Sequence, residues 1–515
     1  MQSDDDFKTI CTLFEEQVQK NPEKTAIYRN DRCITYEAFN KQVNQYTRYL
    51  LRKGLPSNGI VGIQLTRSYE MLVAVFAVLK AGLAYLPLDP SSPMLRNQHI
   101  LQDARIQLLI VDDDPLLSEK ETLYEIRDLQ IITINEDVSL EESHNLNLQV
   151  EKKDLAYVMY TSGTTGTPKG LMISHDALVN RILWMQQAFP LHSQDVLFQK
   201  THVCFDVSVW EICWWSIAGA SVVLLPPNRE HDVKLFTQMI ERYQISVIHF
   251  VPSVFRIFLS YIMEEFPIQR LGSLKYVFLS GEALDARSVN SFNHLFQGNE
   301  ARLVNLYGPT EATIDVSYFI CEKQKEYDNI PIGKAIHNIQ FFVLDEHLNP
   351  TGSEPGELFI SGVGLSQGYL NNHQLTQACF IDNPYLPGEK MYRTGDFVRW
   401  NDEHELIFLG RKDEQVKLHG MRIELGEIQY HLLEHPNIQD AVVICEKIDS
   451  LDNRLIAFLI SNNNPIVIDS AELKAFLKTR IPTYMIPELY VWLNEFPIKT
   501  NGKIDTVKLL SLITP

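Results

Sequence analysis

The chain has 515 residues, of which 45% are apolar, a composition that excludes disordered and fibrous classes. This length exceeds the size at which one hydrophobic core keeps growing, so we expect at least two domains. The formal net charge of −19 argues against nucleic acid or an anionic membrane as main partner, because each phosphate contact needs a lysine or an arginine.

The cysteines and the N-terminus indicate the compartment. The seven cysteines are scattered and form no C-x-x-C pair, which is typical of a reduced protein and disfavours zinc and disulfide frameworks. Residues 1–7 lack the basic and apolar regions of a signal peptide. The longest apolar stretch, residues 71–79, is too short to span a bilayer and favours a buried helix. We therefore expect a cytoplasmic protein without a membrane or nucleic-acid partner.

Short apolar runs alternate with helical patterns over most of the chain. The runs that predict strands span residues 60–65, 108–111, 155–160, 221–225, 247–251 and 276–279. Strands separated by helices favour parallel sheets covered on both faces, and ligands bind beyond the carboxyl ends of such strands. The sequence therefore predicts an α/β fold with its functional residues in loops at that edge.

A glycine-rich loop at residues 161–170 follows one of these strands. Glycine lets backbone N–H groups approach an anion, the hydroxyls add donors and Lys169 adds a positive charge, so the loop suits a polyphosphate. It is not a Walker P-loop, because Lys169 follows Pro168 and precedes Gly170. The loop predicts nucleotide chemistry, and a flexible Ser/Gly turn is the alternative.

The pattern changes in the second half of the chain. Residues 340–410 show short strands with turn signals, which predict a small β-rich subdomain. A charged stretch follows, and the last hundred or so residues carry their own strand and helix signals, enough for a compact domain. We predict an N-terminal core of residues 1–411 and a C-terminal domain of residues 412–515, with a hinge near Asp413.

Six further segments combine glycine, hydroxyl and acidic residues in ways that burial alone would not require. They are residues 205–208, 305–311, 392–396, 410–417, 420–426 and 501–505. Together with the glycine-rich loop, they resemble in order and spacing the core motifs of the adenylate-forming superfamily. The closer resemblance is to amino-acid adenylation domains of nonribosomal peptide synthetases, and it covers nearly the whole chain.

The resemblance implies a fold and a reaction. The fold is a large N-terminal α/β domain of stacked, mostly parallel sheets with helices and a small β subdomain, followed by a small, mobile α+β C-terminal domain. The reaction is that of a ligase that uses ATP and Mg²⁺. An amino-acid carboxylate attacks the α-phosphate to give aminoacyl-AMP and pyrophosphate, and the phosphopantetheine thiol of a peptidyl carrier protein, supplied in trans, then takes the aminoacyl group.

Joining a carboxylate to a polyanion is repulsive, so such a site must neutralise charge and hold the reacting groups in line. By resemblance, Lys503 is the catalytic lysine that contacts the substrate carboxylate and the α-phosphate. Glu311 matches the Mg²⁺-associated glutamate, which suits the preference of this cation for oxygen, and Lys169 is expected to help the leaving pyrophosphate. An exposed terminal lysine is the alternative for Lys503, and a helix N-terminal acid is the alternative for Glu311.

The nucleotide contacts are also carried over from the resemblance. Asp396 corresponds to the residue that accepts both ribose hydroxyls, Arg411 adds a ribose or phosphate contact, and Thr310 donates to phosphate. Tyr307 is placed to stack on adenine, and an aromatic packed in the core is the alternative. The loop residues expected to bind ATP are Thr161, Ser162, Gly163, Thr164, Thr165 and Gly166.

The resemblance also predicts a domain movement. Asp413 falls where the family keeps its hinge, with a solvated loop acid as the alternative. Family members reuse one active site by swinging the C-terminal domain, which removes Lys503 and brings the Gly420 segment beside the pantetheine tunnel.

The expected substrate is an α-amino acid. Asp206 matches the aspartate that pairs with the substrate ammonium, an anion that acyl- and aryl-acid relatives do not need and that would be costly to bury without its partner. The other pocket positions are Val207, Trp210, His249, Phe278, Ser280, Leu306, Ile314 and Asp315. Together with Asp206 and Lys503, this set resembles the one in serine-activating domains.

The pocket chemistry supports L-serine. Trp210 and Phe278 are bulky and should shorten the pocket, whereas His249, Ser280 and Asp315 offer hydrogen bonds to a hydroxyl. A site built around such a bond rejects the analogue lacking it by roughly 10⁴-fold, which favours serine over alanine. In the alternative, His249 and Asp315 form a buried pair that satisfies itself, and selection by size alone favours glycine or alanine.

Other interpretations stay open at this point. The chain shows no condensation motif and no carrier sequence, so we expect either a free-standing enzyme or one domain of a larger synthetase, with a small activator protein of the MbtH-like type as a further partner to test. Ser366, Gln367 and Thr506 depart from the family pattern outside the predicted chemistry. A D-alanine carrier protein ligase is the nearest alternative, and a catalytically silent nucleotide-binding scaffold is the alternative from another class.

Overall fold

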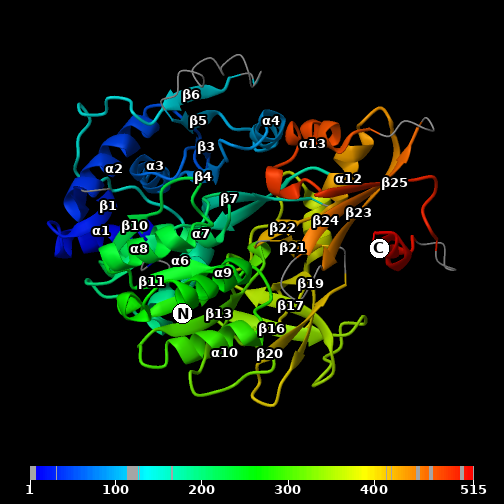
Figure 1. Cartoon of the computed structure of the whole chain (residues 1–515). Coiled ribbons are helices and arrows are strands. Elements are labelled where there is room, and N and C mark those ends of the chain that lie inside the picture. The colour runs from blue at the N-terminus through cyan, green and yellow to red at the C-terminus, as the bar shows by residue number, and fades with distance from the viewer. Residues whose placement is uncertain are drawn as a thin grey trace. The chain divides into compact units, whose positions relative to one another are not determined.

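The structure is a computed structural model whose elements are labelled in Figure 1. It describes residues 7–29, 32–112, 126, 128–163, 166–412, 415–418, 420–447, 453–462, 468–498 and 504–513. The chain divides into two compact units. Unit 1 comprises Met1–Pro90, Leu101–Met159 and Gly170–Lys412, and unit 2 comprises Ser91–Ile100, Tyr160–Lys169 and Asp413–Pro515.

The larger sheet of unit 1 runs in the order β15-β14-β13-β12-β11-β9-β10-β1-β2. Its strands are β1 (Thr25–Arg29), β2 (Arg32–Thr35), β9 (Val196–Gln199), β10 (Ser221–Leu224), β11 (Val247–Phe250), β12 (Tyr276–Leu279), β13 (Arg302–Tyr307), β14 (Ser317–Cys321) and β15 (Lys334–Ala335). Pairing is parallel from β1 through β13, and β2, β14 and β15 extend the two edges in antiparallel pairing. Strands β9 and β11 are buried at every residue and β12 at all but its first, because helices cover both faces.

Helices cover the two faces of this sheet separately. One face packs against α8 (Val233–Tyr243), α9 (Pro252–Glu264) and α10 (Ala286–Leu295), which lie close together in Figure 1. The other face packs against α1 (Ile10–Lys20), α2 (Tyr36–Leu51), α3 (Tyr69–Lys80), α6 (His175–Ala188) and α7 (Val207–Ala218). Side chains alternate along a strand, so Val247 and His249 of β11 point to the α6 and α7 face while Ile248 points to the other.

A second sheet of unit 1 runs in the order β6-β5-β3-β4-β7-β8. Its strands are β3 (Ile60–Gln64), β4 (Ala84–Pro87), β5 (Leu108–Val111), β6 (Gln130–Thr133), β7 (Leu155–Thr161) and β8 (Lys169–Ser174), and α4 spans Met94–Asp103. The pairings from β6 through β7 are parallel. The apolar stretch predicted as a buried helix is α3, which is buried at every residue from Met71 to Lys80. The strands and this helix were therefore predicted correctly from their apolar runs.

A third, antiparallel sheet lies between residues 339 and 411. It contains β16 (Ile339–Leu344), β17 (Gly356–Gly362), β18 (Phe380–Asp382), β19 (Lys390–Trp400) and β20 (Leu406–Arg411), with α11 at His373–Cys379. The order is β16-β17-β19-β18, and β20 also pairs with β19. This sheet holds Asp396 and Arg411 opposite each other in register.

Unit 2 has its own small core. Its sheet has the order β23-β24-β25, and a hairpin is formed by β21 and β22. The bounds are β21 (Val416–Leu418), β22 (Met421–Ile423), α12 (Leu425–Leu433), β23 (Ile438–Lys447), β24 (Asn453–Ser461), α13 (Ser470–Lys478), β25 (Leu489–Leu493) and α14 (Thr506–Ser511). Gly420 lies in the hairpin turn with a φ of 77°, a left-handed conformation that glycine adopts at no steric cost.

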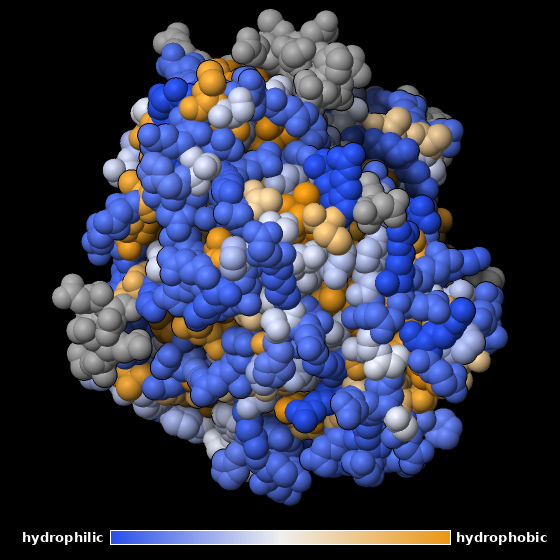
Figure 2. Space-filling model, turned by 90° about the vertical axis from the view of Figure 1, so that its left-hand side faces the viewer, coloured by the Kyte–Doolittle hydropathy of each residue, from blue (hydrophilic) through white to orange (hydrophobic). Residues whose placement is uncertain are grey.

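The described surface and helices bear on the membrane question. The face drawn in Figure 2 is covered mostly by hydrophilic residues with apolar ones scattered among them, which is ordinary for a globular protein. None of the helices in the described part of the chain combines the length and the apolar character needed to cross a bilayer.

Candidate functional site

The predicted substrate residues gather at the carboxyl ends of neighbouring strands in unit 1. His249 is on β11, Phe278 is its register partner on β12, and Leu306 is on β13. Trp210 of α7 packs its ring at 6.0 Å from the His249 ring and 5.6 Å from the Phe278 ring, measured between centroids. The structure thus brings together residues from four elements, as expected for a site at this edge of a parallel sheet.

The segment after β13 passes close to its own turn. Gly308 lies so near Ile314 and Asp315 that a Cβ atom at Gly308 would overlap their backbone. Thr313 and Ile314 have φ angles of 65° and 71°, a left-handed conformation that is rare for β-branched residues and stores strain. The tight Tyr-Gly-Pro-Thr-Glu segment therefore has a local reason for its glycine, and the strain lies at two residues beside the predicted pocket.

His249 provides the clearest hydrogen bond of the pocket. Its Nε2 atom lies 3.0 Å from Ser280 Oγ, and its Nδ1 atom lies 3.5 Å from Thr201 Oγ1. Burial lowers the pKa of His249 well below its usual range, and the charge of Lys200 lowers it further. The imidazole is therefore neutral, with one ring nitrogen that donates and one that accepts. The indole N–H of Trp210 is buried and has no hydrogen-bond partner.

Asp315 is held by an arginine that the sequence patterns did not single out. Arg181 Nη2 donates to Asp315 Oδ2 at 2.8 Å, and both side chains are almost completely buried, with 1% and 2% exposure. The pocket acids and bases therefore have separate partners, because His249 bonds Ser280 while Asp315 bonds Arg181. The only available signal for Arg181 was a charged residue on a helix with a largely apolar buried face.

The remaining pocket residues lie around this group. Asp206 and Val207 stand at the start of α7 and are half-buried, whereas Ile314 and Leu306 are buried. The charge of Asp206 raises the pKa of the Tyr157 hydroxyl, which is fully buried and has no hydrogen-bond partner. Asp206 is therefore within electrostatic range of a buried phenol that the sequence reasoning missed.

Asp396 has a donor on each carboxylate oxygen. The Tyr307 hydroxyl donates to Oδ2 at 2.5 Å, and Arg411 Nη1 donates to Oδ1 at 2.6 Å. Burial and the charge of Asp396 raise the pKa of Tyr307 well above its usual range, so this phenol stays protonated and donates. The structure thus brings together three of the predicted nucleotide residues, and ribose hydroxyls would have to exchange with these two donors.

Glu311 is buried in a 3₁₀ turn, η4 (Thr310–Ala312), which also carries the half-buried Thr310. Its Oε1 atom accepts a hydrogen bond from the Tyr369 hydroxyl at 2.7 Å. Its backbone carbonyl accepts from the backbone N–H of Ser366 at 2.8 Å. Because this last contact uses only the backbone, the departure from the family pattern at Ser366 does not alter it.

The donor set around Glu311 bears on a magnesium ion. Within the described ranges, no three His, Cys, Asp or Glu side chains gather in a way that would hold a metal by themselves. Mg²⁺ usually keeps several waters and is bound through one or two carboxylates together with substrate phosphates. A single buried carboxylate such as that of Glu311 fits a magnesium ion that arrives with ATP.

The described part of the glycine-rich loop belongs to unit 2, where it contacts the segment before and within α12. Ser162 Oγ donates to the Arg422 carbonyl at 2.8 Å, and the Glu424 backbone N–H donates to Ser162 Oγ at 3.2 Å. Lys169 Nζ lies 3.8 Å from Glu424 Oε1. Thr161 Oγ1 is buried without a partner. Lysine and hydroxyl groups predicted for phosphate therefore have protein neighbours here.

A carboxylate of α12 also contacts the loop. The Gly163 backbone N–H donates to Glu427 Oε2 at 3.0 Å, and Arg96 pairs with Oε1 of the same carboxylate. Gly166 has a φ of 87°, and a Cβ atom there would overlap the Tyr430 ring. The N–H group that the sequence assigns to a phosphate thus donates to a protein anion. Of the predicted residues, Thr164, Thr165, Asp413 and Lys503 lie outside the described residues.

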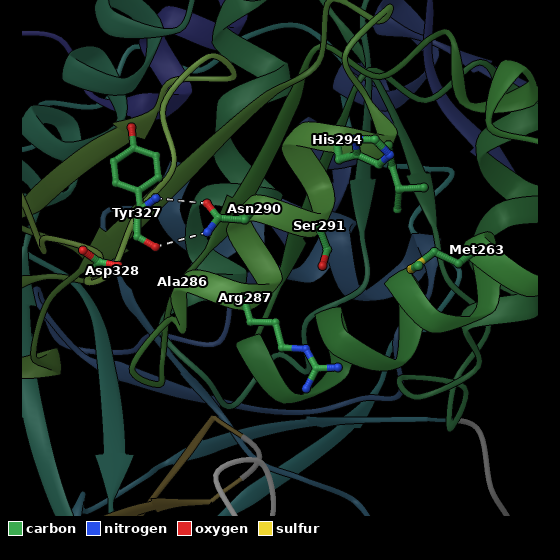
Figure 3. A pocket seen from close by; sticks show the side chains of 9 residues that line it. Met263, Ala286, Arg287, Asn290, Ser291, His294, Tyr327 and Asp328 are labelled. Carbon is green, nitrogen blue, oxygen red and sulfur yellow. Dashed lines mark hydrogen bonds between the residues drawn. The ribbon is translucent and has the colours of Figure 1, made fainter.

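A surface pocket of about 600 Å³ lies elsewhere on unit 1. Residues of α9 and α10 line it together with Tyr327 and Asp328. Figure 3 shows that Asn290 faces Tyr327, and its amide donates to the Tyr327 carbonyl and accepts from the Tyr327 N–H at 3.1 and 3.2 Å. This pocket contains none of the predicted site residues, and the polar atoms of Asn290 are used within the protein.

Comparison with known proteins gives a family and close relatives. Residues 14–370 match the family model described as AMP-binding enzyme, and residues 427–503 match the AMP-binding enzyme C-terminal domain. The chain is 43% identical over 508 residues to a large mycosubtilin synthase polypeptide of Bacillus subtilis, a match that covers 97% of this chain but 19% of that polypeptide. It is 42% identical over 511 residues to zwittermicin A synthase ZmaJ of Bacillus cereus, a match that covers 98% of this chain and 95% of that protein.

Solved structures agree with this result. NpsA-ThdA, an artificially fused adenylation-PCP di-domain from Klebsiella oxytoca, matches with a TM-score of 0.82 and 26% identity over 95% of this chain and 94% of that one. The Vibrio cholerae adenylation domain AlmE, solved with glycyl-adenosine-5′-phosphate, matches in fold with a TM-score of 0.83 and 24% identity over 98% of each chain.

Proposed function

Because this chain belongs to the AMP-binding enzyme family, we propose that it activates L-serine as seryl-AMP and transfers it to the phosphopantetheine thiol of a peptidyl carrier protein. The family membership confirms the expected adenylate-forming fold, with its large N-terminal α/β domain and small C-terminal domain. It also confirms that the chain is an ATP-using adenylation domain of the kind found in nonribosomal peptide synthetases.

The observation that carries the choice of serine is the bonded pair of His249 and Ser280. The pair is buried beneath the rings of Trp210 and Phe278, which leave room for a short side chain. A neutral imidazole and a hydroxyl each donate and accept, so they can share hydrogen bonds with one more hydroxyl. Alanine would leave those groups without that added bond, and this is the physical basis for preferring serine.

The proposed mechanism assigns one task to each residue. Asp206 binds the α-ammonium, and Lys503 binds the carboxylate that attacks the α-phosphate. Asp396 takes the ribose hydroxyls after its present donors move away, and Lys169 draws the pyrophosphate off. Glu311 would hold a Mg²⁺ ion, whose charge, when bound, lowers the repulsion between carboxylate and phosphates.

Amino-acid-dependent ATP–pyrophosphate exchange tests the proposal. The assay covers the twenty standard amino acids and D-alanine, and it is run with and without a co-expressed MbtH-like protein so that a missing activator is not mistaken for inactivity. We expect L-serine to give the highest exchange. A preference for D-alanine would instead identify a D-alanine carrier protein ligase, and no exchange with any amino acid would support the silent scaffold.

A second step tests the partner. Seryl-AMP formed by the enzyme should load a holo carrier protein, detected as a mass increase of the carrier by one seryl group. An apo carrier, which lacks the thiol, is the matched control. Loading that is equal on apo and holo carriers would contradict the proposed thioester.

A further inference from the structure

Arg181 and Asp315 form a buried ion pair at one wall of the proposed substrate pocket. Arg181 projects from α6, while Asp315 follows the strained segment after β13, and their charged atoms lie 2.8 Å apart. Both side chains are at least 98% buried, with exposures of 1% and 2%. Such a pair is formed at a large cost in hydration, so removing one partner leaves the other charge strongly unfavourable where it is.

The position of Arg181 is fixed by neighbours on its own helix. Its Nη1 atom lies 3.1 Å from Met185 Sδ, and its guanidinium lies 4.9 Å from the centre of the Trp184 ring. The charges of Asp315 and Asp206 both act on it and oppose the effect of burial on its pKa. The guanidinium is therefore a built part of the wall, within the field of both acids.

We infer that Arg181 determines specificity: by occupying Asp315, it makes the pocket accept a neutral side chain and reject a cationic one. The inference rests on the proposed amino-acid activation but not on serine in particular. Without a guanidinium at this position, Asp315 would be available to a second ammonium of the substrate. Arg181 is then a positioning residue that acts through Asp315.

The substrate that reveals this role is L-2,3-diaminopropionate. It has the length of serine and carries an amino group in place of the hydroxyl, so Trp210 and Phe278 do not exclude it by size. Its second amino group binds a proton readily beside a carboxylate and poorly beside a guanidinium. Discrimination between serine and this amino acid therefore measures the charge that the pocket wall presents.

The test compares exchange kinetics of Arg181→Met with those of the unaltered chain. Methionine keeps a long, flexible side chain but removes the charge and its donors. We expect kcat/KM for diaminopropionate relative to serine to rise on the order of 100-fold. Arg181→Lys keeps the charge and should show little of this rise. Arg302→Met, at an exposed position that begins β13, should show none of it.

A double variant separates charge from packing. Adding Asp315→Asn to Arg181→Met removes both charges, so the gain for diaminopropionate should disappear. A folded Arg181→Met with the original ratio, or a gain that survives Asp315→Asn, overturns the inference. Folding is checked by circular dichroism and by a cooperative thermal transition.

The reverse change keeps the inference testable if Arg181→Met does not fold. Asp315→Asn alone leaves the arginine without its carboxylate, so exchange with L-aspartate relative to serine should rise, and an unchanged ratio would overturn the inference. If the unaltered chain prefers an amino acid other than serine, the serine proposal fails. Arg181 is then judged by the same ratios taken against that preferred amino acid.

Discussion

The amino-acid pocket and the glycine-rich loop use protein partners in opposite ways. In the pocket, Arg181 holds Asp315, and this pair shapes the wall without taking a group assigned to the reacting part of the substrate. In the loop, the Gly163 N–H, which we assign to a phosphate, donates to the Glu427 carboxylate. The pocket is therefore preorganised, whereas the loop must exchange a protein anion for a substrate anion before it can hold ATP as proposed.

The two regions also differ in how their charges are placed. Burial in the pocket removes water from ionic and hydrogen-bonding groups, which strengthens each interaction and penalises each missing partner. The loop is built from backbone N–H groups and hydroxyls that can change partner at little net cost, because one acceptor replaces another. Substitutions in the pocket should therefore have larger effects than substitutions at the loop.

The largest effect is expected at the ammonium-binding acid. Asp206→Asn keeps the shape of the side chain but removes the charge that would pair with the substrate, so kcat/KM for L-serine should fall by roughly 10³-fold. Pyrophosphate exchange measures it, and Asp328→Asn at an exposed position is the control. Activity within a few-fold of the original would show that Asp206 does not bind the ammonium.

Particular residues show what the sequence could and could not reveal. Strands such as β11 and β12 were predicted correctly, because their apolar runs carry a local signal. The roles of Asp206 and His249 came from resemblance, which transfers positions but not partners. Arg181 was missed because its partner is 134 residues away, and Glu427 was missed because it meets Gly163 across 264 residues. Only the folded chain brings such groups together.

The order of the strands escaped prediction for the same reason. Strand β9 lies between β10 and β11 in the larger sheet, and β7 lies beside β4 in the second. Neither pairing follows from residues that are neighbours in the sequence. Pairing between distant segments is set by the packing of the whole domain, which a local pattern does not contain.

A pH change should weaken the scaffold of the pocket more than any single loop contact. His175, the first residue of α6, is buried and has no hydrogen-bond partner at either ring nitrogen, and burial lowers its pKa from 6.5 to about 4. Protonation therefore opposes folding. The stability due to the neutral ring is fully present above pH 6.5 and is lost as the pH falls towards 4, up to about 3 kcal/mol.

Urea unfolding followed between pH 7 and pH 4 checks this expectation. The free energy of unfolding should decrease as the pH falls, and His175→Gln should flatten part of that decrease. His294→Gln, on α10 at the surface, is the matched control and should leave the slope unchanged. A slope that is the same with and without His175 would show that this ring does not titrate in the way its burial implies.

The selectivity of the pocket should depend on the bond between His249 and Ser280. Ser280→Ala removes one of the two hydrogen-bonding groups assigned to the substrate hydroxyl and leaves His249 Nε2 without its partner. The ratio of kcat/KM for serine over alanine should then fall by about 10- to 100-fold. Ser291→Ala on α10 is the control. An unchanged ratio would favour selection by size alone.

The smallest effect is expected at the loop, where it distinguishes exchange of partners from preorganisation. Glu427→Gln removes the charge that competes with phosphate for the Gly163 N–H, so the KM for ATP should fall by about 3-fold while the KM for serine stays the same. The Gln side chain can still accept hydrogen bonds from Gly163 and Arg96, which limits the loss of stability. Glu434→Gln, at the exposed end of α12, is the control. A KM for ATP that rises in Glu427→Gln would mean that the Glu427 carboxylate supports the nucleotide-binding form of the loop, and the contrast with the pocket would then be wrong.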